Sequence, residues 1–444
     1  MGLKLAVVGG GSTYTPELIG GISTNSDRLP VDEIVLHDID PDRLAVVGGL
    51  ADRMLARVGW PGRLTPTTDA EAALDGADFV LLQLRVGGQA ARLGDETLPR
   101  RFHLIGQETI GAGGFAKALR TVPVALELAE MVERLAAPDA WIVDFTNPVG
   151  IVTQALVDAG HRAVGLCNVA IGFQRRFAER FAVPPSHVEI SQVGLNHLTW
   201  IRAIIVDGVD RLPEVLSADG EELAEDVGLE PERLRRLGAV PSYYLRYYYR
   251  EQEVIAEAGD GMTRAESVIE IERELLEMYR DPALADKPLL LDRRGGAHYS
   301  EAAVQLIASL HDGRGDVQVV DVANAGALPE VEEDAVVEVP ARIDRDGAHP
   351  LRQAPLDRES GELVKQVKTY ERLTAEAART GDRDMALEAL AANPLAGGPG
   401  VAPSLLDALL EANRRWLPRF FDPLLADSEI GTANQPRSGL GPRK

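Results

Sequence analysis

From the N-terminus to about residue 170, short apolar runs alternate with longer stretches in which apolar positions recur at helical spacing. Short runs rich in Val, Ile and Leu are typical of strands buried in a parallel sheet. Because each intervening helix makes a right-handed crossover, the pattern predicts an α/β fold with a buried parallel sheet. The strands are expected at Leu3–Val8, Glu33–Leu36, Phe79–Leu84, Trp141–Phe145 and Ala163–Leu166.

The pattern changes at about Val188, where VEISQVGLNHLTWIRAIIVDG gives two β-rich runs with only a few residues between them. Such a pair predicts an antiparallel element, and with it the start of a second lobe. Further on, residues 220–290 and 358–414 have helical patterns, and two more strands are expected at Val317–Val322 and Ala335–Val339.

A glycine turn, GGGST, ends the first expected strand. Glycines there let backbone N–H groups approach a pyrophosphate, whose charge is favoured by the N-terminus of the following helix. Gly9, Gly11, Ser12 and Thr13 are therefore candidate dinucleotide ligands. The third glycine of the usual fingerprint would fall at Tyr14, so the alternative of a merely tight turn stays open.

The second expected strand ends in HDID. Asp38, or in second place Asp40, is placed to accept hydrogen bonds from an adenosine ribose, and a carboxylate there disfavours the 2′-phosphate of NADP. The alternative is that these acids cap the following helix. The glycine turn and the acid at the end of the second strand together predict an NAD site on a Rossmann-like sheet.

A glycine-dense loop, GQETIGAGGF, carries the carboxylate of Glu108. Arg85 and Arg92 precede it, at the carboxyl end of a strand, where open α/β sheets bind ligands. Much later, Arg294 belongs to an arginine pair beside a glycine turn, which suits a phosphate or a carboxylate. Ordinary solvated charges are the alternative.

Cys167 and His197 each follow an expected strand. A lone cysteine is usually a small buried hydrophobe and a lone histidine is usually structural. A thiolate with an imidazole is also half of a divalent-metal site, whose other positions a substrate or water can fill.

Five of the nine tyrosines lie between positions 243 and 249. On a helix, Tyr244 would share a face with Tyr247 and Tyr248, which is typical of a core stripe. Alternatively, a phenol beside a cation or metal can have its pKa lowered enough to act as a base.

The chain has 46 Lys and Arg against 69 Asp and Glu, a net charge of −23 that disfavours nucleic acids and anionic membranes as partners. Its single cysteine excludes an intrachain disulfide. No apolar run is long enough to span a bilayer, and glycines interrupt the first one before a signal-peptide core could form. We therefore expect a cytoplasmic protein.

Taken together and in order, these segments resemble the NAD-dependent family 4 glycoside hydrolases, and among them the 6-phospho-β-glucosidase branch. The matching segments are VVGGGSTYTPEL, LHDID, LRVGGQAARLGDE, GQETIGAGGFAKALRTVPV, DFTNPVGIVTQAL, GLCN, GLNHLTW, YLRYYY and RRGGAHYSEAA. The resemblance implies a fold like that of lactate and malate dehydrogenases. We therefore expect a Rossmann-like NAD-binding domain at residues 1–190 and a mixed α+β catalytic and oligomerisation lobe at 191–425. Residues 426–444 are rich in Gly, Pro, Ser and Asn with little to bury, which predicts a mobile tail.

The activity implied by the resemblance is an unusual hydrolysis of 6-phospho-β-glucosides. NAD⁺ takes hydride from C3, a base removes the acidified proton at C2, the aglycone leaves C1, water adds, and NADH returns the hydride. A divalent metal, Mn²⁺ by family analogy, holds O2 and O3 and stabilises the enediolate. The implied substrate is a phosphorylated disaccharide or aryl β-glucoside, and the implied assembly is a homodimer or homotetramer.

Carried over by position, the resemblance makes Cys167 and His197 the metal ligands and Tyr244 the base at C2. Glu108 and Asn147 would bind substrate hydroxyls or support the metal.

The 6-phosphate is assigned to Arg85, Arg92 and Arg294, with Arg294 as first choice. Asn168 stands where relatives that cleave α-linked substrates have an aspartate resembling a general acid. Since an amide cannot donate that proton, β-linked or activated aglycones are favoured. Two alternatives are a dehydrogenase that releases NADH and an NAD-sensing protein without turnover.

Overall fold

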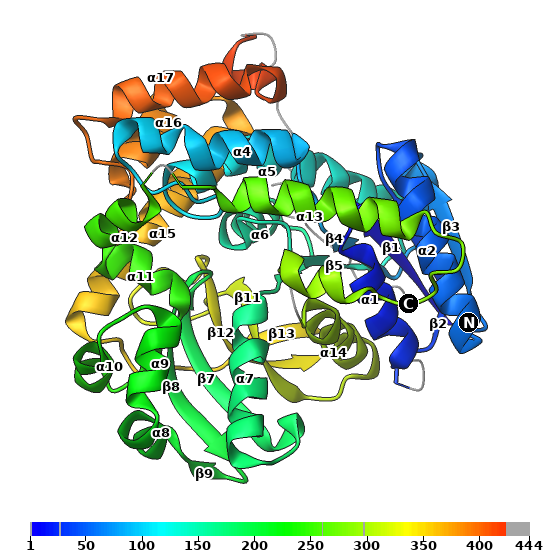
Figure 1. The fold of residues 1–444 in the computed structure, drawn as a ribbon, viewed down its shortest axis with the longest axis horizontal. Coiled ribbons are helices and arrows are strands. Elements are labelled where there is room, and N and C mark those ends of the chain that lie inside the picture. The colour runs from blue at the N-terminus through cyan, green and yellow to red at the C-terminus, as the bar shows by residue number, and fades with distance from the viewer. Residues whose placement is uncertain (1, 26–27, 260, 296–297, 423–444) are drawn as a thin grey trace, which may run out of the picture.

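The computed structural model describes residues 2–25, 28–259, 261–295 and 298–422. The tail expected at 426–444 lies outside these residues. Within them, thirteen strands form one continuous sheet, and helices cover it (Figure 1). None of the helices that the structure describes is both long and apolar enough to cross a membrane.

Six parallel strands form the N-terminal half of the sheet in the order β3-β2-β1-β4-β5-β6. This is the strand order of a dinucleotide-binding Rossmann sheet. The strands are β1 (Leu3–Val8), β2 (Val31–His37), β3 (Arg63–Thr67), β4 (Phe79–Leu82), β5 (Trp141–Asp144) and β6 (Ala163–Gly165). The α/β class and the five expected strands are confirmed.

Strand β3 is the one parallel strand that the sequence pattern did not predict. Its sequence, RLTPT, has no apolar run, and its side chains are exposed or half-buried because it lies at the edge of the sheet. An edge strand also tolerates Pro66, whose missing N–H would break a central ladder. The strand expected third in the chain is consequently the fourth.

The other half of the sheet is antiparallel and continues from β6 in the order β11-β12-β7-β8-β10. Its strands are β7 (Val188–Leu195), β8 (Leu198–Val206), β9 (Val209–Asp210), β10 (Val240–Pro241), β11 (Asp316–Ala323), β12 (Val336–Asp344) and β13 (Gly347–Pro350). The β7–β8 hairpin is the antiparallel element expected from Val188 onward.

Helices cover both halves of the sheet, and Figure 1 shows the C-terminal group, α15 to α17, beside α4 and α5. The bounds are α1 (Thr15–Thr24), α2 (Pro41–Val58), α3 (Ala70–Leu74), α4 (Gly88–Thr97), α5 (Gly111–Leu135), α6 (Val149–Asp158), α7 (Asn168–Phe181), α8 (Leu212–Ala218), α9 (Gly220–Val227), α10 (Pro231–Leu237), α11 (Arg246–Tyr249), α12 (Glu251–Ala258), α13 (Arg264–Tyr279), α14 (Tyr299–Asp312), α15 (Arg358–Thr380), α16 (Arg383–Ala392) and α17 (Ala402–Asn413).

Helix α5 is buried along most of its length, including every residue from Gly111 to Val122. Its first turn packs so closely on the preceding loop that a Cβ at Gly113 would lie 2.2 Å from the Gln107 carbonyl oxygen. Two charged side chains, Lys117 and Arg120, are carried into the interior on this helix.

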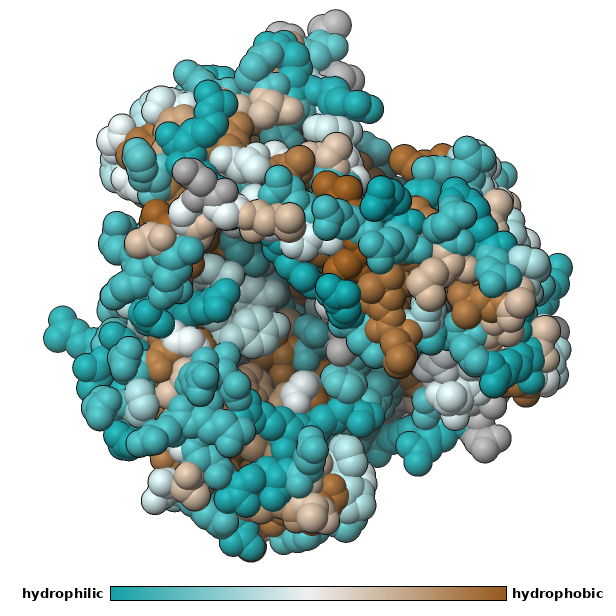
Figure 2. Space-filling view, viewed as in Figure 1, coloured by the Kyte–Doolittle hydropathy of each residue, from teal (hydrophilic) through white to brown (hydrophobic). Residues whose placement is uncertain are grey.

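The space-filling view shows a hollow at the centre of the molecule, between the upper helices and the lobe that carries the β7–β8 hairpin (Figure 2). Pale, weakly polar side chains face this hollow, whereas strongly polar ones cover the outer surface. The residues that carry candidate chemistry come from the strand ends and loops of this part of the fold.

Candidate active site

The glycine turn after β1 is held against the neighbouring strands. Gly9 has φ +93°, and the N–H groups of Gly9 and Gly10 donate to the His37 carbonyl oxygen at 2.9 and 2.7 Å. A Cβ at Gly9 would lie 2.6 Å from the Gln83 carbonyl oxygen. The close approach and positive φ therefore require glycine, although Tyr14 replaces the third glycine of the usual fingerprint.

Asp38 and Asp40 have different roles in the structure. Asp40 caps α2, with its Oδ1 accepting from the N–H groups of Asp42 and Arg43 at 3.1 and 3.0 Å. Asp38 instead accepts from the Gly11 N–H at 2.9 Å, which places its carboxylate against the glycine turn. The helix-capping alternative thus describes Asp40, and Asp38 stays the predicted ribose ligand.

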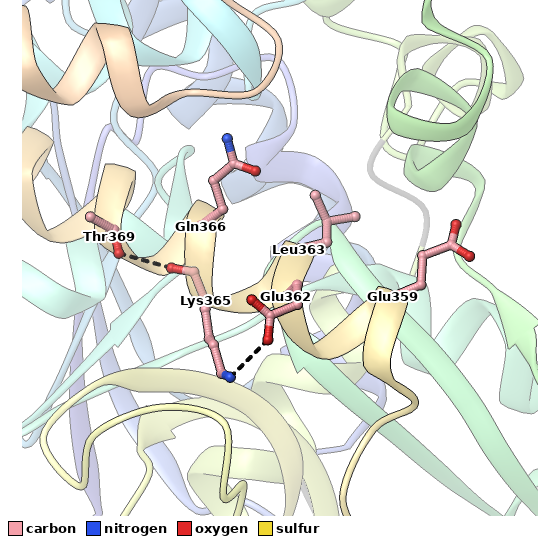
Figure 3. Close-up of a pocket in the computed structure, with 6 residues that line it drawn as sticks. All are labelled: Glu359, Glu362, Leu363, Lys365, Gln366 and Thr369. Atoms are coloured by element: carbon pink, nitrogen blue, oxygen red, sulfur yellow. Dashed lines mark hydrogen bonds and ion pairs between the residues drawn. The ribbon is translucent and has the colours of Figure 1, made fainter.

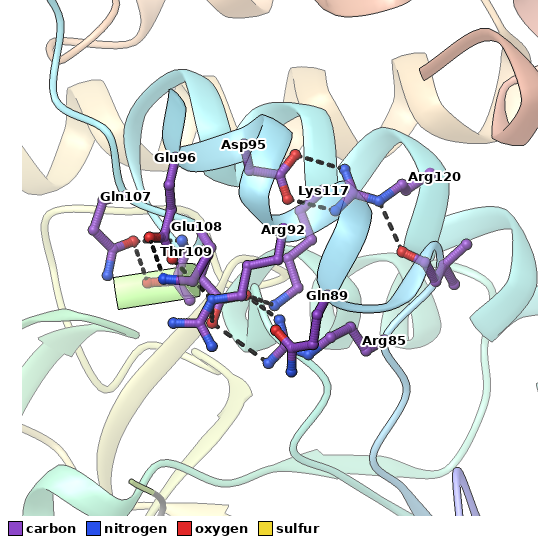
Figure 4. A network of polar contacts seen from close by, with 12 residues as sticks. Arg85, Gln89, Arg92, Asp95, Glu96, Gln107, Glu108, Thr109, Lys117 and Arg120 are labelled. Atoms are coloured by element: carbon purple, nitrogen blue, oxygen red, sulfur yellow. Dashed lines mark hydrogen bonds and ion pairs between the residues drawn. The ribbon is translucent and has the colours of Figure 1, made fainter. Parts of the chain in front are cut away.

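Glu108 is the centre of a buried ion-pair cluster (Figure 4). Its carboxylate pairs with Arg85, with Arg92 Nε at 3.3 Å and with Lys117 Nζ at 2.7 Å. Burial alone would raise the pKa of Glu108, but the three cations hold that pKa well below its usual range. Glu108 is therefore a fixed anion that can accept hydrogen bonds, and it is a poor proton donor.

Lys117 is itself almost completely buried, and burial lowers the pKa of its ammonium group to about 7. Burial and the nearby Lys117 charge lower the pKa of His197 to about 3. The His197 imidazole is therefore neutral at neutral pH, as a metal ligand must be. It lies in the β7–β8 turn with φ +63°.

Cys167 lies between β6 and α7 with a buried thiol. Burial, together with the carboxylates of Glu338 and Asp321, raises the pKa of the thiol well above its usual range, while a hydrogen bond from Asn196 opposes that rise. A divalent cation at the sulfur would reverse this preference and favour the thiolate.

One row of paired residues crosses the sheet and brings Cys167 toward the hairpin turn of His197. Gly165 of β6 pairs with Asp321, Asp321 with Glu338, and Glu338 with Gly194 of β7. The Asn196 amide then donates to Glu338 Oε2 at 3.0 Å and also hydrogen-bonds Cys167.

The two carboxylates in this row were not among the predicted site residues. Asp321 and Glu338 are each at most 1% exposed, and burial raises the pKa of Glu338 to about 7. A sequence signal was present, because each acid interrupts an apolar strand, in VVDVA and VVEVP. Acidic residues are rarely buried unless they are paired.

The tyrosine-rich segment is not one continuous helix. Tyr243–Leu245 forms a 3₁₀ turn and α11 follows it. The Tyr244 ring stacks on the His197 ring with 3.8 Å between centroids and an interplanar angle of 20°. Tyr244 therefore lies against the β7–β8 turn that carries His197, and it packs against the core together with Tyr248 and Tyr249.

In the chain alone the Tyr244 phenol is not activated. Burial raises its pKa well above the usual value, and Tyr243 and Cys167 raise it further. A base at Tyr244 would therefore need a bound cation to lower the pKa of the phenol.

The three candidate phosphate ligands converge. Arg294 donates from Nη2 and Nε to Glu272 Oε1 at 3.0 and 3.2 Å. Burial lowers the pKa of Arg294, and the nearby charges of Arg85 and Arg92 lower it further. Three guanidinium groups thus lie in one region of the site. Glu272 connects this region to the glycine turn, because it accepts from both Arg294 and Thr13.

Asn147 and Asn168 follow β5 and β6 in the chain. The Asn147–Pro148 peptide bond is cis, and Asn147 Oδ1 is a buried acceptor without a hydrogen-bond partner in the described part of the chain. Asn168 is the first residue of α7, directly after Cys167.

The donor set fits a divalent metal that is completed by its substrate. The protein offers a sulfur, a neutral imidazole nitrogen and the unpaired Asn147 Oδ1. Over residues 2–422, apart from the three short gaps at 26–27, 260 and 296–297, no group of three or more His, Cys, Asp or Glu side chains is arranged to hold a metal. Cys167 and His197 would leave positions open on the metal, and a catalytic metal site keeps an open position for water or substrate.

A separate surface hollow beside α15 has no comparable chemistry (Figure 3). All of its lining residues belong to that one helix: Glu359, Glu362, Leu363, Lys365, Gln366 and Thr369. Lys365 and Glu362 pair with each other at 3.1 Å.

Comparison with known proteins identifies the family to which the whole chain is similar. A model of the family 4 glycosyl hydrolases matches residues 4–183, and a model of their C-terminal domain matches residues 192–396. The chain is 42% identical over 441 residues to the probable 6-phospho-beta-glucosidase of Bacillus subtilis (strain 168), covering 96% of this chain and 99% of the relative.

Among solved structures, the chain is similar to the 6-phospho-beta glucosidase from Thermotoga maritima, with a TM-score of 0.88 and 35% identity over 93% of this chain and 99% of that one. That structure contains NAD and glucose-6-phosphate, and another of the same enzyme contains manganese, NAD⁺ and glucose-6-phosphate. Malate dehydrogenase from Plasmodium falciparum, with a TM-score of 0.54 and 15% identity over 85% of this chain and 99% of that one, shares the fold. The expected family and fold are confirmed.

A buried ion pair joins the helices that frame the site, and it gives a test of how they are held. Arg120 of α5 donates to Asp95 of α4 at 2.8 and 2.5 Å and to Asn413 of α17 at 3.2 Å. Arg120→Met would leave the Asp95 carboxylate buried without its partner, and we expect a loss of about 3–5 kcal/mol in the free energy of unfolding. Urea denaturation of the variant and the unmodified protein measures this change in the free energy of unfolding.

Two further variants separate this effect from a general loss of packing. Asp95→Leu combined with Arg120→Met removes both charges and should recover most of the loss. Arg414→Met breaks the exposed pair with Glu411 and should change stability by less than about 1 kcal/mol. A double variant as unstable as Arg120→Met alone would contradict the interpretation.

Proposed function

The chain belongs to family 4 of the glycosyl hydrolases, and from that premise we propose that it hydrolyses 6-phospho-β-glucosides, using bound NAD⁺ and a divalent metal. The observation that carries the proposal is the meeting of three groups of side chains at one end of the sheet. The first group is the glycine turn with Asp38. The second is Cys167 with His197, whose ring stacks on Tyr244. The third is the set of arginines around Glu108 and Glu272.

The arginines are suited to the 6-phosphate. Guanidinium groups bind phosphate oxygens through paired, charge-assisted hydrogen bonds. Arg294 is the first choice because its Nε and one Nη2 hydrogen face Glu272, which leaves its other N–H groups for a ligand. Phosphate at this point orients the sugar ring relative to the glycine turn.

Cys167 and His197 would hold the metal, with Asn147 Oδ1 as a further acceptor for a substrate hydroxyl or for the metal. When bound, the metal polarises the O2 and O3 oxygens and stabilises the negative charge that develops between C2 and C3. Glu108 remains ionised throughout and accepts from a substrate hydroxyl without giving up a proton.

Tyr244 would remove the C2 proton. Its ring lies directly on His197, so a cation held by His197 is close enough to stabilise the phenolate. NAD⁺ on the glycine turn supplies a reversible hydride acceptor for C3, which makes the C2 proton acidic.

Asn168 follows Cys167 and offers no acidic proton for the leaving group. This favours β-linked or activated aglycones over α-linked ones. We also infer a cytoplasmic location, from the single cysteine and the interrupted first apolar run, and a homodimer or homotetramer, from the resemblance to the family. A dehydrogenase that releases NADH is the second candidate, since it needs the same sheet and the same glycine turn.

The deciding experiment is hydrolysis of a chromogenic β-glucoside with and without a 6-phosphate, each in the presence and absence of NAD⁺ and Mn²⁺. We expect hydrolysis to require the phosphate, NAD⁺ and metal, with no accumulation of NADH, because the hydride returns to the same sugar. NADH absorbance that grows in step with substrate consumption would identify a dehydrogenase instead.

The metal assignment is tested with Cys167→Ser. We expect the variant to lose Mn²⁺ affinity and Mn²⁺-dependent hydrolysis, since a hydroxyl is a far weaker ligand than a thiolate. NAD⁺ affinity and the thermal midpoint serve as controls and should stay close to the unmodified values. Normal turnover with an unchanged Mn²⁺ dependence would show that Cys167 is not a metal ligand.

The Tyr244→Phe variant distinguishes a catalytic base from a residue that only packs in the core. The variant keeps the ring and loses the phenol, so a base role predicts a rate lower by on the order of 10²-fold or more. In D₂O, it also predicts less deuterium at C2 of the product. A core role predicts a stability loss on the order of 1 kcal/mol and near-normal turnover.

The matched control is Tyr247→Phe, whose ring lies 6.3 Å from that of Tyr244. It should turn over normally. Product from the unmodified enzyme without deuterium at C2, combined with near-normal rates for Tyr244→Phe, would exclude both the residue and the elimination mechanism.

A further inference from the structure

Glu272 lies on α13, outside every sequence segment that pointed to the site. It is 4% exposed, and α13 is attached to α4 by a hydrogen bond from the Ala265 N–H to Glu96 Oε2 at 2.7 Å. The Glu272 side chain therefore has a fixed position between the dinucleotide turn and the arginine cluster.

The Glu272 carboxylate has hydrogen-bond and ion-pair partners from four different parts of the chain. Its Oε1 accepts from Thr13 Oγ1 at 3.2 Å, from Gln89 Nε2 at 2.9 Å, and from Arg294 Nη2 and Nε at 3.0 and 3.2 Å. Its Oε2 lies 3.5 Å from Arg43 Nη2. One carboxylate thus contacts both the glycine turn and the arginine chosen for the phosphate.

Arg43 extends this connection to the other side of the turn. Its Nε donates to the Gly11 carbonyl oxygen at 3.2 Å, while the Gly11 N–H donates to Asp38. Glu272 therefore supports the turn twice, directly through Thr13 and indirectly through Arg43.

The contact with Arg294 also sets the orientation of that guanidinium. A guanidinium has five N–H donors in a rigid plane, and Glu272 engages two on one edge. The remaining three point along the other edges and can meet a phosphate. A buried arginine without an acid would lose both its charge balance and this orientation.

We propose that Glu272 is a positioning residue shared by two ligand sites: it orients Arg294 toward the substrate phosphate and holds the glycine turn that receives the dinucleotide. The inference rests on the proposed function, because it takes Arg294 as the phosphate ligand. In this proposal the negative charge of Glu272 orients Arg294 for the phosphate, and its carboxylate oxygen accepts the Thr13 hydrogen bond that holds the turn for the dinucleotide.

These two contributions can be separated by substitution. Glu272→Gln keeps an oxygen that can accept from Thr13 and weakens only the 3.5 Å contact with Arg43 on the side of the turn, but it removes the charge that orients Arg294. Glu272→Ala removes both. Glu274→Gln is the matched control, because Glu274 is exposed on the same helix.

Isothermal titration of the full-length enzyme measures NAD⁺ binding, and glucose 6-phosphate binding at saturating NAD⁺. For Glu272→Gln we expect the Kd of NAD⁺ to stay within about twofold and the Kd of glucose 6-phosphate to rise on the order of tenfold. For Glu272→Ala both should rise. With a phosphorylated chromogenic glucoside, Glu272→Gln should raise KM on a similar scale and leave kcat nearly unchanged.

Unchanged glucose 6-phosphate affinity in Glu272→Gln would overturn the proposal. So would an equal weakening of both ligands together with a lower thermal midpoint, since that result describes a purely structural residue. If the unmodified enzyme binds NAD⁺ but not glucose 6-phosphate, the proposed function fails and this inference fails with it. Binding of both ligands by the unmodified enzyme, with no effect of Glu272→Gln, overturns this inference alone.

Discussion

The balance of buried charge is the constraint on which this structure depends. Helix α5 is buried along most of its length and still carries Lys117 and Arg120. Each cation needs an acid from another element, because an unpaired charge in the interior costs several kcal/mol. Glu108 and Asp95 meet that need, and in doing so they fix the glycine-dense loop and α4 against α5. The ligand site is built on these pairs.

Much of this arrangement could be predicted from the sequence. Apolar runs identify a buried parallel strand because both of its faces are covered, so β1, β2, β4, β5 and β6 were found. The predicted ligands Asp38, Arg85, Asn147 and Cys167 follow β2, β4, β5 and β6, and parallel strands end at the same edge of a sheet. Family resemblance then gave a role to Cys167 and His197, which their spacing alone did not.

The features that escaped prediction depend on contacts between distant parts of the chain. Strand β3 has no apolar run, since an edge position does not require one. Glu272 is one of many acids on a charged helix, and only the folded chain shows that it meets Thr13 and Arg294. The tyrosine segment had helical spacing, but in the structure it forms a 3₁₀ turn, whose Tyr244 stacks on His197, followed by a short α-helix. Local propensity yields to tertiary packing there.

The join between the two halves of the sheet has a consequence for how this chain can change over time. β6 meets β11, and β12 meets β7, through one residue pair each, and both pairs involve an acid beside Cys167 and Asn196. Because side chains alternate across a strand, a slip of one residue would turn Asp321 or Glu338 to the opposite face. An insertion or deletion within β11 or β12 would therefore displace one of these acids, whereas a change of length in the connection at 324–335 leaves the pairing intact.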